Sequence, residues 1–322
     1  MEHLLEVKNL SVSFDTDLGE VRAVKNAEFY IDKGEIYGIV GESGSGKSVT
    51  TKSILRLGPS NIRIKSGEII FHGQDILKLT KKELQELRGK DISVVFQDSQ
   101  SALNPVYTVG RKMVELLRRH EKINKKEAEE RVPKLFENVG IVDPVRCFHS
   151  YPHELSGGMR QRVMIAMAIC CNPGLMIADE PTTALDVTIQ AQILHLLRDI
   201  QREKGMSIIL ITHDLGVVAQ MCSRVAVMCG GYVVEEGLVR DIFHHPAHPY
   251  TKALIASMPR VGGKFEQFLE RDISEHLNEN LCPFYKRCKY AQEICGKELP
   301  VMKEIGGGQK VFCHLGKEIN NG

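Results

Sequence analysis

Residues 41–48 read GESGSGKS and match the pattern G-x4-G-K-[ST] at every fixed position. The β-branched run before them predicts a buried strand, and a helix is expected to begin near Lys47. Glycines in such a turn let successive backbone N–H groups face one point, where the helix N-terminus adds partial positive charge. The segment therefore predicts a cradle for nucleotide phosphates; the alternative is a Gly- and Ser-rich loop that matches by chance. The residues expected to contact the nucleotide are Ser43, Gly44, Ser45, Gly46, Lys47, Ser48 and Val49.

Two residues of this loop have distinct expected roles. The Lys47 ammonium group is expected to reach the β- and γ-phosphates, because it follows the last glycine of the pattern directly. The Ser48 hydroxyl is expected to bind Mg²⁺. Together these two side chains would neutralise and orient the phosphate chain of a bound ATP.

A second candidate site lies in LMIADEP, where the apolar run 175–178 predicts a buried strand that ends in two acids. Asp179 is the carboxylate expected on the Mg²⁺ side of a nucleotide-hydrolysing site. Glu180 is placed to act as a general base on the attacking water, a role typically worth about 10² to 10⁴ in rate. The alternative is an acidic turn after a core strand.

A third candidate is His213, which follows the isoleucine-rich run 208–211 in SIILITHDLG. A histidine at the carboxyl end of a parallel strand lies where ligands bind in open α/β sheets. We expect His213 to donate a hydrogen bond to the γ-phosphate and to orient the water that Glu180 polarises. The alternative for a histidine after a strand is a surface or capping residue.

The stretch YPHELSGGMRQRVMIAMAI at 151–169 contains the signature LSGG with Gln161 beyond it. The motifs also occur in a fixed order, from the phosphate loop through SVVFQD, LSGG, the Asp–Glu pair and TTALD to His213. In these respects the chain resembles an ABC transporter nucleotide-binding subunit over residues 1–260. The resemblance implies an α/β P-loop NTPase fold of the ABC ATPase type. Its expected parts are a RecA-like core, an antiparallel β subdomain and a helical subdomain at 98–170.

The same resemblance implies further roles for residues outside the phosphate loop. Two subunits of this family enclose two ATP molecules head to tail, so the signature of one chain would contact the nucleotide held by its partner. The signature residues concerned are Ser156, Gly157 and Gly158. Asp186 in TTALD would link the two halves, and Gln97 would contact Mg²⁺ and the attacking water. Phe14 in SVSFDTD is the candidate for stacking on adenine, although a Phe at a strand end is as often a core residue.

Two stretches resemble the peptide/nickel importer branch, and especially its dipeptide and oligopeptide ATPases: SALNPVYTVG at 101–110 and HPAHPYTKALIASMP at 245–259. The implied partners are a second ABC ATPase subunit, expected to be a paralogue in a heterodimer, and two transmembrane permease subunits. An extracytoplasmic peptide-binding protein would act indirectly. The chain would then lie at the cytoplasmic face of the membrane as a peripheral subunit. The alternative is a soluble, non-transport ABC ATPase, a class that often has two nucleotide domains or a basic surface.

Four cysteines near the C-terminus follow the spacing C-x5-C-x6-C-x17-C: Cys282, Cys288, Cys295 and Cys313. Four thiolates suit a [4Fe–4S] cluster, whereas structural zinc usually begins with ligand pairs two to four residues apart. Zinc and free thiols remain alternatives. The C-terminal extension of the dipeptide-permease ATPases is similar to this arrangement, and some members carry a cluster there. We expect the cluster to stabilise a small domain rather than to sense redox state. The cations expected to offset its negative charge are Lys286, Arg287 and Lys289.

The bulk composition excludes several classes of protein. The chain of 322 residues has 42 Lys and Arg against 41 Asp and Glu, so it lacks the basic excess typical of nucleic-acid binders. The longest apolar run, 163–171, is too short to span a bilayer. The N-terminus lacks the features of a signal peptide, which predicts a cytosolic protein whose nine cysteines are thiols or metal ligands.

The elements that must position these residues follow from their periodicity. Residues 1–96 alternate like antiparallel strands around the phosphate-loop helix, and 98–170 have apolar residues at helical spacing. A helix is expected from 186 until Gly205 ends it, and residues 223–237 predict a hairpin that turns at Gly230–Gly231. We place a boundary near 260, between the ATPase domain 1–260 and a small cysteine-rich domain 261–322.

Overall fold

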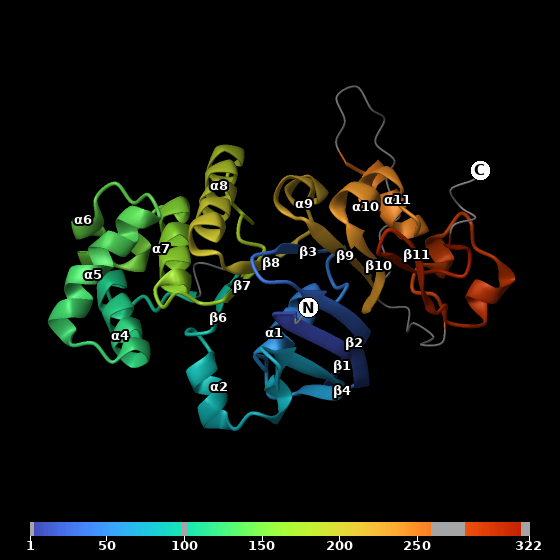
Figure 1. Ribbon diagram of the computed structural model, residues 1–322, viewed down its shortest axis with the longest axis horizontal. Coiled ribbons are helices and arrows are strands. Elements are labelled where there is room, and N and C mark those ends of the chain that lie inside the picture. The colour runs from blue at the N-terminus through green and yellow to red at the C-terminus, as the bar shows by residue number, and fades with distance from the viewer. Residues whose placement is uncertain (1–2, 98–101, 259–280, 317–322) are drawn as a thin grey trace. The chain divides into compact units, whose positions relative to one another are not determined.

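The computed structural model describes residues 3–97, 102–258 and 281–316, and its contacts divide the chain into two compact units. The first, called here the loop unit, contains Met1–Ile31, Ile36–Leu77 and Thr212–Gly322. The second, called the helical unit, contains Asp32–Glu35 and Lys78–Ile211. Figure 1 labels the elements of both units.

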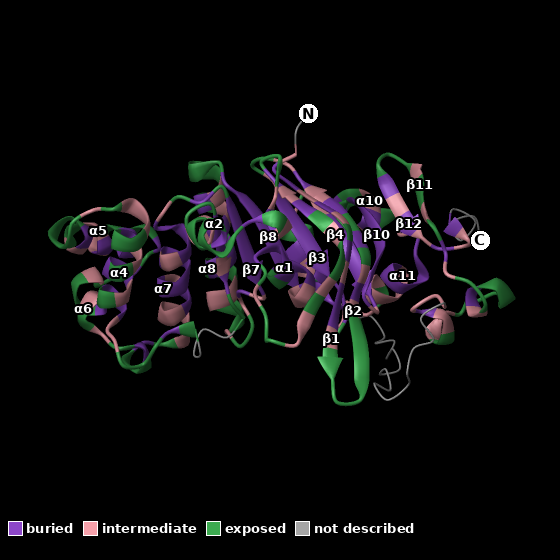
Figure 2. Ribbon diagram, turned by 90° about the horizontal axis from the view of Figure 1, so that it is seen from below, coloured by how far each residue is buried: buried purple, intermediate pink, exposed green. Residues whose placement is uncertain are grey.

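The antiparallel sheet of the loop unit has the strand order β2-β1-β4-β5. Each strand pairs with its neighbours in an antiparallel register, with Leu5 opposite both Ile31 and Phe71. Inward side chains along these strands are buried, whereas the turn between the first two strands is exposed (Figure 2). This sheet is the antiparallel β subdomain that the alternating pattern predicts. Its strands are β1 (Leu5–Thr16), β2 (Gly19–Ile31), β4 (Ile62–Phe71) and β5 (Gln74–Asp75).

The remaining strands of the loop unit follow one another in the order β11-β12-β10-β9-β3. The first of these along the chain, β3, lies parallel to β9 and is buried along its whole length (Figure 2). The β9–β10 hairpin turns at Gly230–Gly231, as the sequence predicts, and both glycines have positive φ. The strands are β3 (Ile36–Val40), β9 (Arg224–Cys229), β10 (Tyr232–Leu238), β11 (Met302–Gly306) and β12 (Gln309–Phe312).

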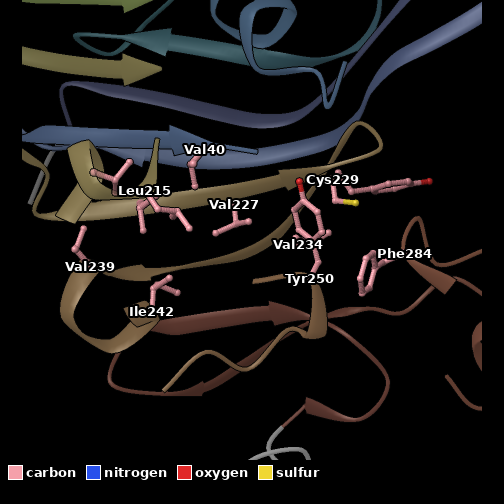
Figure 3. Packing of buried hydrophobic residues seen from close by; sticks show 12 residues of the cluster. Val40, Leu215, Val227, Cys229, Val234, Val239, Ile242, Tyr250 and Phe284 are labelled. Atoms are coloured by element: carbon pink, nitrogen blue, oxygen red, sulfur yellow. The ribbon is translucent and has the colours of Figure 1, made fainter. Parts of the chain in front are cut away.

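Short helices cover this part of the loop unit. Valines from β9 and β10 pack with Leu215, Tyr250 and Phe284 in one buried hydrophobic cluster (Figure 3). Phe284 comes from the cysteine segment, so that segment contributes to this hydrophobic cluster. The helices are α1 (Lys47–Ile54), α9 (Leu215–Met221), α10 (Val239–His244), α11 (Pro249–Ala256), η3 (Tyr285–Arg287) and η4 (Glu293–Gly296).

The helical unit has three parallel strands, β6 (Ile92–Val95), β7 (Leu175–Asp179) and β8 (Ser207–Thr212), the last residue of which belongs to the loop unit. Side-chain caps from Thr108, Asn124 and Asp143 begin three of its helices. Helices α4 to α7 fall within the segment 98–170 expected to be helical, of which 98–101 lie outside the described residues. The helices are α2 (Lys81–Leu87), α4 (Val109–Glu121), α5 (Lys125–Asn138), α6 (Pro144–His149), α7 (Gly157–Ile169) and α8 (Val187–Lys204), with the turn η2 (Pro152–Glu154). Of the turn η1 (Ile76–Lys78), the first two residues belong to the loop unit and only the last belongs to the helical unit.

The described part of the C-terminal segment, 281–316, does not form a domain of its own. It belongs to the loop unit, and its strand β12 pairs with β10 through Glu235 opposite Val311. The expectation of a separate cysteine-rich domain is therefore corrected, because β12 is hydrogen-bonded to the core sheet. The boundary expected near 260 lies outside the described residues. Among the described helices, none combines the length and the apolar composition that a membrane span requires.

Candidate active site

The predicted phosphate loop connects the buried strand β3 to helix α1 within the loop unit. The helix begins at Lys47, and its N-cap Gly46 has φ 103°, a left-handed conformation that glycine adopts without steric cost. The Ser45 N–H donates to the Glu42 carbonyl at 3.2 Å, and the Thr50 N–H donates to the Gly46 carbonyl at 2.9 Å. The loop therefore turns tightly just before a helix N-terminus, which is the arrangement that binds anions.

Two glycines of the loop lie where no side chain fits. A Cβ at Gly41 would overlap the Met228 carbonyl oxygen, and one at Gly46 would lie 2.6 Å from the Ala23 carbonyl oxygen. Both neighbours are backbone atoms, so they cannot move aside cheaply. These positions thus require glycine for steric reasons.

The polar side chains of the loop are arranged around its backbone. The Lys47 ammonium group is buried and donates to the carbonyls of Gly41 at 2.8 Å and Glu42 at 2.9 Å. The Ser45 hydroxyl is buried and has no hydrogen-bond partner among the described residues. Ser48 and Val49 lie in the first turn of α1 and are half-buried. The loop therefore contains a cation and an unsatisfied hydroxyl, two groups that can donate to a phosphate.

Glu42 has contacts that the sequence did not indicate. Its backbone N–H donates to the Tyr250 hydroxyl at 2.9 Å, and its carboxylate accepts from Arg287. The residues that make these contacts follow it by 208 and 245 positions. The stretch HPAHPY and the cysteine segment were the only signals at these positions, and neither indicated contact with the phosphate loop.

Two further predicted residues also lie in the loop unit. Phe14 is a half-buried residue of β1, opposite Val21 on one side and Ile62 on the other. His213 follows β8 and is exposed, just before Asp214 caps helix α9. Their roles in nucleotide binding stay predictions.

The helical unit brings together three of the predicted catalytic and metal-binding residues at the carboxyl ends of parallel strands. Gln97 follows β6, whereas Asp179 ends β7 and Glu180 follows it. The Gln97 amide donates to Glu180 Oε2 at 3.0 Å, and the Thr183 hydroxyl donates to the same oxygen at 2.8 Å. Asp179 is only 2% exposed, and the Glu180 N–H donates to the Ile211 carbonyl at 2.9 Å.

The backbone of Glu180 is held in an uncommon conformation. Its φ of 47° is left-handed, which costs a non-glycine residue of order 1 to 3 kcal/mol. Such strain persists only where surrounding bonds impose it, and here one backbone bond and two side-chain bonds do so. The carboxylate is therefore positioned by residues from β6, the β7–α8 loop and β8.

The signature residues lie at helix starts in the same unit. Ser156 is the exposed N-cap of α7, and its hydroxyl accepts from the Met159 N–H at 3.3 Å. Gly157 and Gly158 form the first turn of that helix. Asp186 is the exposed N-cap of α8 and accepts from the Ile189 N–H at 3.0 Å. The structure thus gives Ser156 a structural capping role and leaves it accessible on the surface.

The four C-terminal cysteines line one small cavity in the loop unit, together with Phe284 and His248. Burial is the main cause that raises the pKa of Cys282 to about 12, and the other three thiols raise it further. Among the described residues, no group of three or more His, Cys, Asp and Glu side chains is arranged to hold a single metal ion. Arg287, expected to offset the charge of a cluster, is instead paired with Glu42.

His248, which lines this cavity, is almost fully enclosed at 1% exposure. Its Nδ1 accepts from the Tyr250 N–H at 3.0 Å, and its Nε2 has no hydrogen bond of good geometry among the described residues. Burial lowers the pKa of His248 to about 3, and a weak interaction with the Phe312 backbone acts in the opposite direction. The ring is therefore neutral, with one nitrogen unsatisfied beside the thiols.

The backbone around His248 is tied to the buried carboxylate of Glu235. This carboxylate accepts from the Ala247 N–H at 2.7 Å, the His248 N–H at 2.9 Å and the Gln309 amide at 2.7 Å. Burial raises the pKa of Glu235, and these donors act in the opposite direction. Glu235 thus joins β10, the HPAHPY stretch and β12, a role that sequence reasoning missed because it involves three distant segments.

Two family models match this chain, one over the region that contains the phosphate loop and one over part of the C-terminal region. A family model described as ABC transporter matches residues 24–183, and one described as oligopeptide/dipeptide transporter, C-terminal region, matches residues 234–295. The chain is 55% identical to the oligopeptide transport ATP-binding protein OppD of Bacillus subtilis over 83% of this chain and 75% of that protein. It is 49% identical to the dipeptide transport ATP-binding protein DppD of the same organism over 98% of this chain and 95% of the other.

Similar folds occur among solved structures. The ATP-binding cassette MJ0796, solved as a dimer bound to ADP and phosphate, matches with a TM-score of 0.65 and 29% identity. The match covers 73% of this chain and 99% of that one. The ABC ATPase fold expected from the motifs is confirmed. This chain belongs to the ATP-binding proteins of the ABC transporter family, in its oligopeptide/dipeptide transporter branch.

Proposed function

We propose that this protein hydrolyses ATP to power the import of dipeptides or oligopeptides across the cytoplasmic membrane. The observation that carries the proposal is the phosphate loop, where two glycines have no room for a side chain and where a buried lysine and an unsatisfied serine hydroxyl both occur. Its relatives are named oligopeptide and dipeptide transport ATP-binding proteins, which supports peptides as the cargo.

Within this proposal, the residues of the loop unit bind the nucleotide. The backbone of Ser43 to Val49 and the Lys47 ammonium group hold the phosphates, and Phe14 stacks on adenine. A shift of the Lys47 ammonium group from the carbonyls of Gly41 and Glu42 towards the phosphates would exchange neutral acceptors for charged ones. His213 donates a hydrogen bond to the γ-phosphate.

The remaining steps are metal binding and proton transfer. Ser48, Gln97 and Asp179 are the proposed Mg²⁺ ligands, and the metal would supply charge neutralisation at the phosphates. Glu180 accepts a proton from the attacking water. Its hydrogen bonds from Gln97 and Thr183 keep the carboxylate oriented for that transfer.

The proposed working form pairs the chain with a second ABC ATPase subunit, which we take to be a paralogue. Ser156, Gly157 and Gly158 would contact the nucleotide held by that partner, and Asp186 would link the two subunits. The exposure of Ser156 and Asp186 supports this proposal, because a partner can reach both. Two membrane-spanning permease subunits would hold the pair peripherally at the cytoplasmic face, and an extracytoplasmic binding protein would deliver the peptide.

We further propose that Cys282, Cys288, Cys295 and Cys313 hold a [4Fe–4S] cluster. The observation that supports this proposal is that all four thiols line one cavity, and four thiolates are the ligand set that such a cluster takes. When bound, the cluster would cross-link four points of the segment, and zinc is the alternative occupant.

The import proposal is tested by uptake in the organism that encodes the chain. Deletion of its gene should abolish ATP-dependent uptake of a radiolabelled dipeptide or oligopeptide, and the unaltered gene should restore it. The variant Lys47→Ala, expressed at the same level, should not restore uptake. Normal uptake in cells that express only this variant would contradict the proposal.

The cluster proposal is tested on protein purified without oxygen. Visible absorption with about four iron and four sulfide per chain, lost in Cys288→Ser, would support it. The scattered Cys222→Ser is the matched control and should keep the absorption. Colourless protein that holds one zinc would overturn the cluster and leave the ATPase proposal unaffected.

A further inference from the structure

The cysteine segment contacts the phosphate loop directly through Arg287. Its Nη1 donates to both carboxylate oxygens of Glu42, each at 3.0 Å, and its side chain is 16% exposed against 38% for Glu42. Arg287 lies between Cys282 and Cys288, so the two thiols flank the residue that holds the loop. A change in the position of this short segment would therefore move the partner of Glu42.

A second contact reaches the same loop residue from helix α11. The Tyr250 hydroxyl accepts the backbone N–H of Glu42, and the tyrosine is 1% exposed. Phe284 packs edge to face on Tyr250, with 5.4 Å between the ring centroids. The Arg287 guanidinium group lies over both rings, 5.0 Å from the centroid of Phe284 and 5.8 Å from that of Tyr250. One packed group thus holds Glu42 by its backbone and by its side chain.

Glu42 in turn determines where Lys47 lies. The Glu42 carbonyl accepts from the Lys47 ammonium group at 2.9 Å and from the Ser45 N–H at 3.2 Å. The Gly41–Glu42 peptide group carries both the N–H that the Tyr250 hydroxyl accepts and the Gly41 carbonyl that accepts from Lys47 at 2.8 Å, so the Tyr250 contact opposes its rotation. Arg287 holds the Glu42 side chain, and so opposes a change at the following peptide group, whose carbonyl accepts from Lys47 and Ser45.

We propose that Arg287 and Tyr250 are positioning residues that set the affinity of the phosphate loop for ATP, and that the four-cysteine segment is thereby coupled to nucleotide binding. The inference rests on the proposed nucleotide site and does not depend on which metal the cysteines hold. Coupling between two sites is reciprocal, so ATP at the loop must also change the cysteine segment. The segment then holds the phosphate loop in position, and its own conformation changes when ATP binds to the loop.

A purely structural role for Arg287 makes a different prediction. A partly exposed ion pair contributes little to stability, so its loss should leave the fold intact. If Arg287 only fastens the cysteine segment to the unit, neither Arg287→Gln nor Glu42→Gln would change the ATP affinity of the folded protein. If Arg287 positions the loop, both variants should weaken ATP binding to the same extent, because each removes the ion pair between Arg287 and Glu42.

The first test measures the affinity of the full chain for a fluorescent ATP analogue and the KM and kcat for ATP. Arg287→Gln and Glu42→Gln should each weaken affinity about fivefold and raise KM, with kcat within twofold. The double variant should bind the ATP analogue with the same affinity as the weaker-binding single variant, because the same ion pair is lost in all three proteins. Arg287→Lys should restore part of the affinity, and Lys289→Ala, an exposed cation of the same segment, should change nothing.

The second test measures the reciprocal effect. The alkylation rate of Cys288 in the protein as purified, followed by mass spectrometry, should change at least twofold when ATP is added. In Arg287→Gln this dependence on ATP should disappear, while Lys289→Ala should keep it. A structural role alone would change the rate equally with and without ATP.

Two results would each overturn the inference. Affinities of Arg287→Gln and Glu42→Gln within twofold of the parent, with nucleotide lost in Lys47→Ala, would overturn this inference and leave the nucleotide site intact. Unaltered ATP binding in Lys47→Ala would overturn the nucleotide site and the inference with it. If Arg287→Gln fails to fold, Glu42→Gln still tests the inference, because it removes the same ion pair from the side of the phosphate loop, outside the cysteine segment.

Discussion

The phosphate loop and the cysteine segment of the loop unit are held in opposite ways. The loop is closed by bonds within a few residues, such as Ser45 to Glu42 and Thr50 to Gly46. The segment 281–316 has short-range backbone bonds as well, but its attachment to the unit depends on distant residues, through β12 on β10 and the contact of Arg287 with Glu42 across 245 positions. The phosphate loop can be identified from its sequence, because its closing bonds join nearby residues. The position of the cysteine segment cannot, because it depends on contacts with distant parts of the fold.

The largest effect should come from the core contact of the cysteine segment. Phe284 is 4% exposed within the main cluster, so Phe284→Ala should lower the free energy of unfolding by about 3 to 5 kcal/mol. Denaturant unfolding of the full chain measures this value. Ile294→Ala, at a side chain 41% exposed in the same segment, should cost under about 0.5 kcal/mol. Equal costs for both variants would mean that the segment does not depend on this core.

The next effect, on ATP binding, concerns the phosphate loop itself. Lys47→Ala should weaken ATP binding about 100-fold, equivalent to about 3 kcal/mol, because a charged donor to the phosphates is lost. The melting temperature should barely change, since the bonds that close the loop are backbone bonds. Equilibrium binding measures the affinity, with exposed Lys52→Ala on the same helix as control. A large loss of stability would contradict the view that short-range backbone bonds close the loop.

A smaller effect is expected at the carboxylate that joins β10, HPAHPY and β12. Glu235→Ala leaves three buried donors unsatisfied and should cost about 2 kcal/mol of stability. Burial raises the folded-state pKa of Glu235 above 4.5, so the stability that its neutral form contributes is present below pH 4.5 and is lost as pH rises through the folded pKa. The stability difference between parent and variant should therefore shrink as pH rises. Exposed Glu304→Ala is the control, and a difference that grows with pH would refute the assignment.

The smallest effect tests the second contact with the loop. Tyr250→Phe removes the acceptor of the Glu42 N–H and keeps the ring, so ATP affinity should fall about fivefold, or about 1 kcal/mol. Exposed Tyr290→Phe should leave the affinity unchanged. If both variants bind ATP alike, α11 does not contribute to the loop.

Much of the fold could be predicted because its signals are local. The loop from Gly41 to Ser48, the hairpin at Gly230–Gly231 and the helix end at Gly205, which has φ 61°, each depend on backbone conformations that specific residues favour. The sequence predicts that Gln97 and Glu180 each follow a strand, but their hydrogen bond depends on the parallel pairing of β6 and β7, which the structure shows.

The remaining features could not be predicted from periodicity. The sequence suggested a separate C-terminal domain, but the register of β12 on β10 depends on strand pairing across more than 70 residues. Arg287 is one of several cations near the cysteines, and nothing in its neighbourhood indicates Glu42 as its partner. Buried acids such as Glu235 are also invisible in the sequence, because their donors are backbone groups of other segments.

The central claim, that this chain is an ATPase whose chemistry depends on Glu180, is tested most directly by ATP binding and hydrolysis in Glu180→Gln, measured together with the partner subunit. The account predicts that this variant retains ATP and that turnover falls about 10² to 10⁴-fold, while exposed Glu203→Gln on α8 hydrolyses ATP normally. Hydrolysis by Glu180→Gln at the parent rate would contradict the account.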